Sequence, residues 1–363
     1  MDREELTLIL STSILGVMWG ANSLATPLYL SSLHYNATYI GVLIGVSTLT
    51  ASGLSVVSGF LADSYGRRKF ITLNRLLSIT GLFLFGIFRI PLGYVIVNQF
   101  GGSLTSALLA EKSRNLEKSL SLQSSIMEGF VILGNLLGGL LPFQELYIVE
   151  ICFLITSLVM IRTVSENYER RPLKFRMSSI GIVGKFSVDS LIGLGAGALL
   201  PLISLWFNIA YGVGRTALAP VFILSQASLA VGTFAAPSLG RVLGKVRAIV
   251  ITHAAAIVVL FVIPLSATFV MAASLYVVRN VLMNMTSPLF SSMILQMVPR
   301  DERSRAQTII QLMDSIPRAV GPTLGGYFLS LNDLYLPFLF TGSLYLTSTV
   351  LFFFMFRGIE RKG

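Results

Sequence analysis

Residues 59–69 read Gly-Phe-Leu-Ala-Asp-Ser-Tyr-Gly-Arg-Arg-Lys, a short stretch that turns from apolar to strongly basic. It joins two apolar runs, 38–62 and 70–87, each close to the roughly 20 residues that a helix needs to cross a bilayer. Similar apolar runs separated by short polar connections recur along the whole chain. The stretch therefore predicts a turn between two membrane-spanning helices.

The composition extends this prediction to the whole protein. Of the 363 residues, 54% are hydrophobic and only 12% are charged, and the mean hydropathy is +0.77. Such values are typical of a chain whose solvent is lipid, so we predict an all-α membrane protein of twelve spans with little room for a soluble domain. The predicted spans are 6–30, 38–62, 70–87, 90–110, 120–141, 144–163, 179–206, 215–239, 247–265, 269–298, 305–329 and 334–356.

The basic residues give the expected orientation. The net charge is +10, yet most of the 27 Lys and Arg residues fall in the connections on the side of the N-terminus, and Arg89 and Arg215 are the ones expected on the opposite side. Basic loops are retained in the cytoplasm, so both termini are expected inside a cell membrane. This distribution explains the net charge without a nucleic-acid partner.

The longest polar stretch, 165–178, divides the chain nearly in half. We expect it to be a cytoplasmic linker between an N-terminal bundle, 1–164, and a C-terminal bundle, 179–363, each of six helices. The charged residues 1–5 precede the first apolar run without a cleavage pattern, so no removable signal peptide is expected.

Several chemistries are disfavoured by what the sequence contains. Cys152 is the single cysteine and lies in an apolar run, while the two histidines, His34 and His253, are far apart. Neither a metal site nor a histidine-based catalytic centre is expected from so few ligands. No glycine-rich phosphate-binding pattern is present, so we predict a protein that is not an enzyme, has no cofactor and draws its energy from a gradient.

Two matched pairs of motifs indicate that the halves are repeats. Residues 134–139, Gly-Asn-Leu-Leu-Gly-Gly, match residues 321–326, Gly-Pro-Thr-Leu-Gly-Gly, and 59–69 match a degraded copy at 237–247. Internal repeats of this kind are common in transporters. The predicted architecture is therefore two pseudo-symmetric bundles. The helix-packing residues expected from the first pair are Gly134, Gly138, Gly139, Gly321, Pro322, Gly325 and Gly326.

The stretch 59–69 resembles the signature loop of the major facilitator superfamily of transporters, and the twelve-span plan extends the resemblance over the whole chain. Physically, Gly59 permits close helix approach, Gly66 permits a tight turn, and Asp63 offers a carboxylate to the basic residues beside it. The resemblance implies that these residues gate transport, together with Arg67, Arg68 and Glu111, with Arg67 bridging to Glu111. The alternative is that the charges only fix the topology.

The glycine motifs resemble a pattern of drug:proton antiporters within that superfamily, although Asn135 stands where their proline belongs. That group also has an arginine where this chain has Val95. The resemblance therefore favours export only weakly, and plain helix packing is the alternative interpretation of the glycines.

Ionisable residues inside predicted spans are the candidates for substrate and proton contact, because such groups are costly in lipid. The resemblance implies that the spans containing Asp189 and Arg279 line the central cavity. An internal ion pair is the alternative, either Asp314 with Arg318 or Lys185 with Asp189, because residues four apart share a helix face. The full set of candidates is Asp189, Arg279, Glu128, Asp314, Arg318, Asn22, Asn98 and Gln99.

These observations lead to one functional hypothesis with two alternatives. We predict a monomeric, proton-coupled exporter of small amphipathic organic compounds that works by alternating access, with a small molecule, protons and membrane lipid as its partners. The first alternative is uptake of a metabolite or organic anion held by Arg279 and Arg318. The second is a receptor that binds its ligand without moving it.

Overall fold

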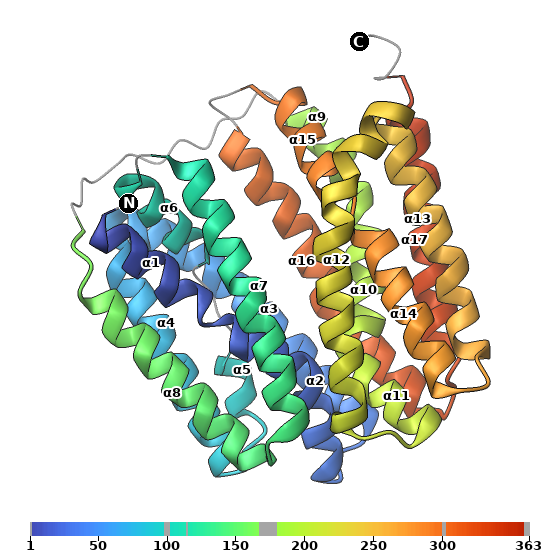
Figure 1. Ribbon diagram of the computed structural model, residues 1–363, viewed down its shortest axis with the longest axis horizontal. Coiled ribbons are helices and arrows are strands. Elements are labelled where there is room, and N and C mark those ends of the chain that lie inside the picture. The colour runs from blue at the N-terminus through green and yellow to red at the C-terminus, as the bar shows by residue number, and fades with distance from the viewer. Residues whose placement is uncertain (1, 98–101, 114, 167–179, 300–302, 359–363) are drawn as a thin grey trace. The chain divides into compact units, whose positions relative to one another are not determined.

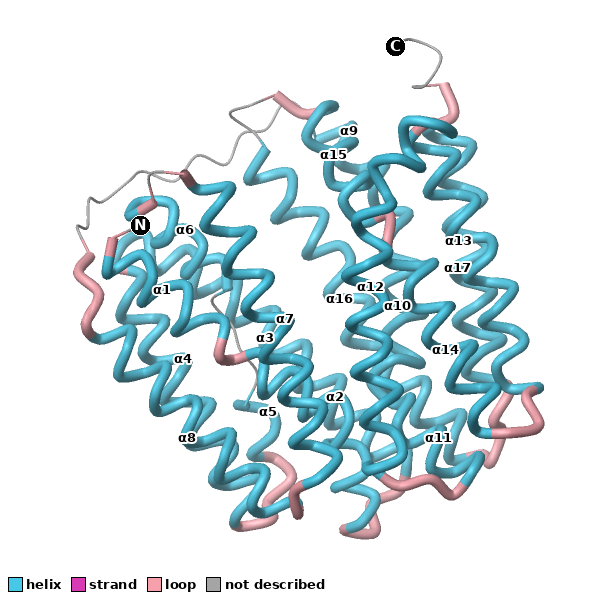
Figure 2. The backbone as a smooth tube through the Cα atoms, in the orientation of Figure 1, coloured by secondary structure: helices cyan, strands magenta, loops and turns pink. Residues whose placement is uncertain are grey.

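The computed structural model of the protein describes residues 2–97, 102–113, 115–166, 180–299 and 303–358. All regular elements in these ranges are helices, joined by short loops (Figure 2). In lipid, where no water can satisfy backbone N–H and C=O groups, helices meet this need within a single segment. The predicted all-α membrane protein is confirmed.

The described residues fall into two compact units, each built from more than one stretch of the chain. Figure 1 shows the helices coloured by residue number from the N-terminus to the C-terminus. Unit 1 comprises Met1–Tyr35, Val46–Lys174 and Arg215–Pro220, and unit 2 comprises Asn36–Gly45, Phe175–Gly214 and Val221–Gly363. The predicted boundaries at 164 and 179 stay a prediction.

Within the described residues, the first half of the sequence supplies nine helical elements. They are α1 (Arg3–Ser13), α2 (Gly16–Ser32), α3 (Ala37–Tyr65), α4 (Arg67–Leu82), the π-helical turn η1 (Phe83–Ile87), α5 (Gly93–Val97), α6 (Gly102–Lys112), α7 (Leu116–Leu140) and α8 (Phe143–Arg162).

The second half supplies the remaining elements. They are α9 (Ile180–Lys185), η2 (Phe186–Val188), α10 (Asp189–Leu199), η3 (Leu200–Leu202), α11 (Ile203–Tyr211), α12 (Arg215–Leu243), α13 (Lys245–Val262), η4 (Ile263–Leu265), α14 (Phe269–Asn284), α15 (Ser287–Met297), α16 (Arg303–Ser330) and α17 (Leu336–Phe356).

Ten stretches of the described residues are long and apolar enough to cross a membrane. Two predicted spans are not among them. The span 90–110 includes residues 98–101, which lie outside the description, and the span 305–329 corresponds to α16, whose apolar character is reduced by Asp314 and Arg318. The count of twelve stays a prediction.

Local chemistry explains where a predicted span is interrupted. The run 6–30 forms two helices, α1 and α2, that meet at a turn over Ile14 and Leu15. Just before the turn, the hydroxyls of Ser11 and Thr12 both donate to the Leu8 carbonyl, each at 3.0 Å. Such bonds compete with the backbone ladder and bend helices.

Glycines hold α2 against α7 in unit 1. A Cβ added to Gly134 of α7 would lie 2.1 Å from the Val17 carbonyl oxygen of α2, and one added to Gly20 of α2 would lie 2.0 Å from the Val131 oxygen of α7. Side chains at these positions would force the two backbones apart, so the helix pair depends on small residues.

Unit 2 contains an equivalent pair, α10 with α16. A Cβ added to Gly325 of α16 would lie 1.8 Å from the Ala198 oxygen, and one added to Gly321 would lie 2.4 Å from the Ala198 nitrogen. A Cβ added to Gly197 of α10 would lie 2.2 Å from the Arg318 oxygen. The glycine motifs matched in the sequence therefore occupy corresponding helix contacts in the two units.

The remaining residues of the motifs lie at the ends of these helices. A Cβ added to Gly138 would lie 3.3 Å from a backbone atom of Ala21, and one added to Gly139 would lie 2.4 Å from the Ala219 Cβ. A Cβ added to Gly326 would lie 2.3 Å from the Ala37 oxygen. Pro322 lies inside α16.

The α2–α7 contact yields a matched pair of variants. Gly134→Ala should lower the melting temperature in detergent, by the equivalent of about 1 to 3 kcal/mol, because the new methyl group overpacks the contact with Val17. Gly129→Ala in the same helix should leave it unchanged or raise it slightly, since an added Cβ there meets nothing within 4 Å and alanine favours the helix. Equal effects of the two substitutions would contradict this packing.

Candidate functional site

The turn between α3 and α4 is set by Gly66. Its φ of +94° is a conformation that residues with side chains rarely adopt, and it directly precedes the first residue of α4, Arg67. Gly59 was expected to permit close helix approach, but a Cβ added there would meet nothing within 4 Å among the described atoms. The side chain of Asp63 lies outside the described part of the structure.

Two acids bind the start of α4 from different elements. The Arg67 guanidinium forms an ion pair with Glu111 near the end of α6, which is the predicted bridge. The Glu166 carboxylate accepts hydrogen bonds from the backbone N–H groups of Arg67 and Arg68, at 2.6 and 3.0 Å. A carboxylate at this position satisfies donors that have no partner within the helix and complements the positive end of the helix dipole.

The same region binds the beginning of the chain. Lys112 forms an ion pair with Glu4 at 2.7 Å, and Ser165 donates to Glu4 through both its N–H and its hydroxyl, each at 3.0 Å. Arg68 Nη1 donates to the Val164 carbonyl at 2.8 Å. We call the group Glu4, Arg67, Arg68, Glu111, Lys112, Val164, Ser165 and Glu166 the loop cluster.

Sequence reasoning found Arg67, Arg68 and Glu111 but missed Glu166. Glu166 lies nearly one hundred residues after the turn, and only the fold brings it there. Its position just after an apolar run, at the start of the polar linker, was the available signal.

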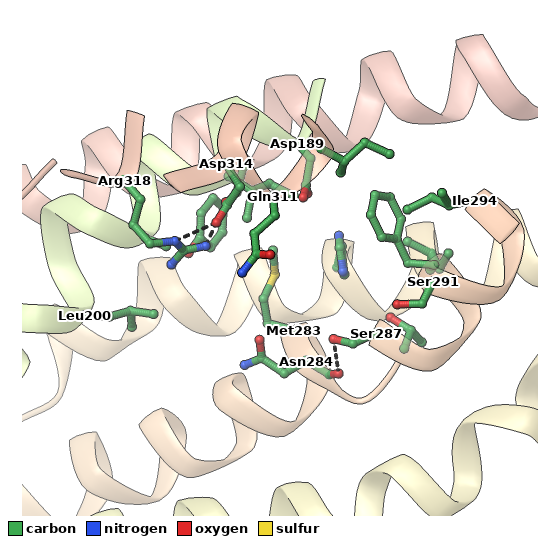
Figure 3. A pocket seen from close by; sticks show the side chains of 18 of the residues that line it. Asp189, Leu200, Met283, Asn284, Ser287, Ser291, Ile294, Gln311, Asp314 and Arg318 are labelled. Carbon is green, nitrogen blue, oxygen red and sulfur yellow. Dashed lines mark hydrogen bonds and ion pairs between the residues drawn. The ribbon is translucent and has the colours of Figure 1, made fainter. Parts of the chain in front are cut away.

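A cavity of about 470 Å³ lies within unit 2. Asp189 of α10 and Gln311 and Asp314 of α16 reach toward it from one side, and Met283 and Asn284 of α14 reach toward it from the other (Figure 3). The structure therefore brings together four of the predicted candidates, which are Asp189, Arg279, Asp314 and Arg318.

The rest of the lining combines polar and apolar groups. The polar residues include His253, Asn284, Thr286, Ser287, Ser291 and Gln311, and the apolar ones include Ile192, Leu200, Ile249, Phe290, Ile294 and Ile310. Cavities of this mixed kind bind small organic molecules, because a few polar groups orient a ligand whose apolar parts are covered. His253 and Gln311 were not among the predicted candidates.

The charged side chains at the cavity differ in their partners. Arg318 binds Asp314 through two hydrogen bonds of 2.8 Å, from Nε to Oδ2 and from Nη2 to Oδ1. Arg279 is 1% exposed and donates from Nη2 to the Tyr345 hydroxyl at 2.8 Å. Asp189 forms no ion pair with any residue that the structure describes, and the Lys185 side chain is exposed. The cavity thus has a neutralised pair, a shielded cation and an acid without a cation partner.

The other candidates are dispersed or outside the described residues. Asn98 and Gln99 lie outside them, and Glu128 is an exposed residue of α7. Asn22 of α2 donates from Nδ2 to Glu150 Oε2 at 2.9 Å in unit 1. Glu150 was missed, although an acid inside the apolar run 144–163 was a visible signal.

Apolar helices long enough to cross a membrane, together with a cavity of mixed polar and apolar lining, fit a multi-pass membrane transporter. The chain matches the model of the Major Facilitator Superfamily over residues 8–291 and 186–363, and it belongs to this family. This membership confirms the resemblance that residues 59–69 carry. It also confirms the prediction that the protein is a transporter and not an enzyme.

Solved structures share the fold. The crystal structure of the nucleoside transporter NupG aligns with a TM-score of 0.77 and 13% identity, covering 98% of this chain and 99% of that one. The D-xylose–proton symporter aligns with a TM-score of 0.76 and 12% identity, covering 96% of each chain.

One curated relative also matches. It is YJR124C, an uncharacterized membrane protein of Saccharomyces cerevisiae, 24% identical over 204 residues. The match spans 53% of this chain and 44% of that protein.

The loop cluster predicts a graded effect at Glu166. Glu166→Ala should lower the melting temperature in detergent by the equivalent of about 1 kcal/mol, because it removes the acceptor for two N–H groups at the start of α4. Glu166→Gln should cost less, since it keeps an oxygen acceptor and loses the charge. An alanine variant as stable as the wild type would show that this carboxylate does not hold the turn.

The Asp314–Arg318 pair predicts a charge-swap result. Asp314→Ala should destabilise the protein by about 1 to 3 kcal/mol, because it leaves a partly buried guanidinium without its acid. Exchanging the two residues, Asp314→Arg with Arg318→Asp, should recover part of that loss in the same thermal assay. Recovery of stability without recovery of transport would assign the pair a role in transport beyond holding α16.

Proposed function

We propose that the protein is a secondary active transporter that exports small amphipathic organic compounds in exchange for protons. The observation that carries this proposal is the cavity of unit 2, where Asp189 lies without a cation partner among described residues, opposite polar and apolar groups that suit an amphipathic molecule. An acid in such a site can gain and lose a proton as access changes from one side of the membrane to the other.

The geometry disfavours the organic-anion alternative. Arg318 is neutralised by a bidentate bond to Asp314, and Arg279 is almost completely buried behind Tyr345. Both guanidiniums line the cavity, but Arg318 is already neutralised, and Arg279 offers only Nε and Nη1, which are buried and have no hydrogen-bond partner among the described residues. A neutral or cationic amphipathic compound fits this lining better.

Uptake is the second candidate, and one observation favours it. A structural neighbour is a D-xylose–proton symporter, and another is a nucleoside transporter. The glycine motif supports export only weakly, and plain helix packing is its alternative interpretation. Export and uptake differ in the direction of flux relative to the proton gradient.

We further propose that the loop cluster acts as a gate that closes in one state of alternating access and opens in the other. Its support is the chain of contacts from Glu111 through Arg67 to Glu166, which joins α6, α4 and the residues after α8. The proposed setting is a cell membrane with both termini in the cytoplasm, where the basic connections are expected, and a monomer is the proposed functional form.

Transport in proteoliposomes tests the function. Uridine, D-xylose and the amphipathic cation ethidium are first ranked by the thermal shift that each causes. When a pH gradient is imposed, the wild type should accumulate at least one of the three against its concentration gradient. The direction of the pH gradient that drives accumulation distinguishes the two mechanisms. In antiport the compound moves opposite to the protons, and in symport it moves with them. Binding without flux would indicate a receptor, and flux that ignores the pH gradient would contradict proton coupling.

Asp189→Asn gives the residue-level prediction. This variant should lose accumulation driven by the pH gradient yet keep exchange of the compound across the membrane, because the amide preserves the shape but cannot carry a proton. Lys185→Gln is the matched control, since it lies one helical turn earlier and is exposed. Unchanged accumulation in Asp189→Asn would remove this residue from the coupling mechanism.

A further inference from the structure

A buried acid in unit 1 has no role in the sites described so far. Glu150 lies in the interior of α8, a helix of 20 residues, and its side chain is 0% exposed. Oε2 accepts one hydrogen bond, from Asn22 Nδ2 at 2.9 Å, and Oε1 has no hydrogen-bond partner among the described residues. A carboxyl group this buried and this poorly partnered needs a physical explanation.

The groups around Glu150 are phenols and aromatic rings. Tyr147 is on the same helix one turn earlier, and its hydroxyl is buried and has no hydrogen-bond partner in the described structure. The Tyr147 ring packs 5.1 Å from Tyr29 of α2 and 5.3 Å from Phe85 of η1, and Phe85 packs 5.0 Å from Tyr94 of α5. The surroundings therefore contain weak donors and no second acid.

Three basic side chains of unit 1 are candidate partners of Glu150. Arg75 of α4 donates to Ser157 at 3.1 Å and to Asn74 at 2.7 Å. Arg215 lies over the ring of Phe143, with Cζ 3.7 Å from the ring centre, and donates to backbone carbonyls. Arg89 follows η1 near Tyr29. None of the three forms an ion pair with Glu150.

An ionised carboxylate in this place would be uncompensated. Burying a charge without a partner in an apolar interior is strongly unfavourable, whereas a neutral carboxylic acid needs only one acceptor contact and one donor contact. Oε2 already accepts from Asn22, which leaves Oε1 to carry the proton. The local structure fits an acid that holds a proton.

A polar connection leads from Glu150 toward the surface of α2. The Thr26 hydroxyl donates to Asn22 Oδ1 at 2.8 Å, which fixes the amide so that its Nδ2 points to Glu150. Asn22 is half-buried and the next residue, Ser23, is exposed. Asn22 thus joins a sealed carboxyl group to a more accessible face.

From this geometry we propose that Glu150 is a proton-binding site of unit 1, loaded and unloaded on the side of Asn22 during the transport cycle. In the step, the Glu150 carboxylate takes a proton from a hydronium ion that reaches it on this side, which leaves the neutral acid and a water molecule, and it gives the proton back to a water molecule, which becomes hydronium, when access changes. No bond other than O–H forms or breaks. The inference rests on the proposed proton-coupled function and adds a second proton site to Asp189.

Infrared spectroscopy of the protein in lipid, without any ligand, tests the protonation. The wild type should show the carbonyl stretch of a protonated carboxylic acid at neutral pH, and Glu150→Gln should lose that intensity while keeping an oxygen that accepts from Asn22. Glu145→Gln is the matched control, because Glu145 lies on the same helix and is exposed. Equal carbonyl intensity in the wild type and Glu150→Gln would overturn the proton site.

Transport tests the coupling. In proteoliposomes, Glu150→Gln should lose accumulation driven by the pH gradient, for whichever of uridine, D-xylose and ethidium the wild type accumulates, and should keep exchange. Accumulation by Glu150→Gln equal to the wild type would show a static buried acid and overturn the proposal. A wild type that accumulates none of the three overturns the proposed function instead, and the infrared result then decides the proton site separately.

Discussion

The structure depends on one constraint, the need to satisfy every backbone N–H and C=O group where water is absent. Helices meet it along each segment, which leaves side chains free to set the distance between segments. At α2 with α7, and at α10 with α16, glycines bring the two backbones into direct contact. Where the helices are interrupted, at Ile14 and Leu15, the backbone stays paired, because the N–H groups of these residues donate to the carbonyls of Leu10 and Thr12 at 3.1 and 3.2 Å.

These close contacts also position the polar groups. In unit 2, Gly193 lies against the backbone and carboxyl oxygens of Asp314, and Gly197 against the Arg318 carbonyl. The same glycines that permit helix contact therefore hold the ion pair beside Asp189 at the cavity. In unit 1, α2 carries both the contact with α7 and Asn22, the partner of Glu150. Packing and polar chemistry share one helix in each unit.

Much of the fold and part of the site could be predicted from the sequence. Apolar runs, loop charges and the stretch 59–69 were sufficient for the fold class and the family, because each depends on local composition. The Arg67–Glu111 contact followed from the resemblance. Glu166 and Glu150 were missed because their partners, the α4 N-terminus and Asn22, are distant in sequence, and only tertiary packing brings them together.

Gly59 shows the opposite case, since a conspicuous glycine has no close neighbour in the described structure. A residue can thus match a family motif although the sequence does not show which residues it contacts. The division of roles among Asp189, Arg279, Asp314 and Arg318 was also beyond sequence patterns. Only the positions of the side chains distinguish the neutralised pair from the acid that lacks a cation partner.

The position of Glu166 has a mechanical consequence. Its carboxylate grips the first peptide groups of α4, and the chain continues directly from it toward the second half of the protein. The two residues before it are held as well, because Arg68 donates to the Val164 carbonyl and the Ser165 N–H donates to Glu4. The residues that follow α8 are thus fastened to the start of the chain and to the α3–α4 turn, so a displacement of the first turn of α4 would be transmitted to both.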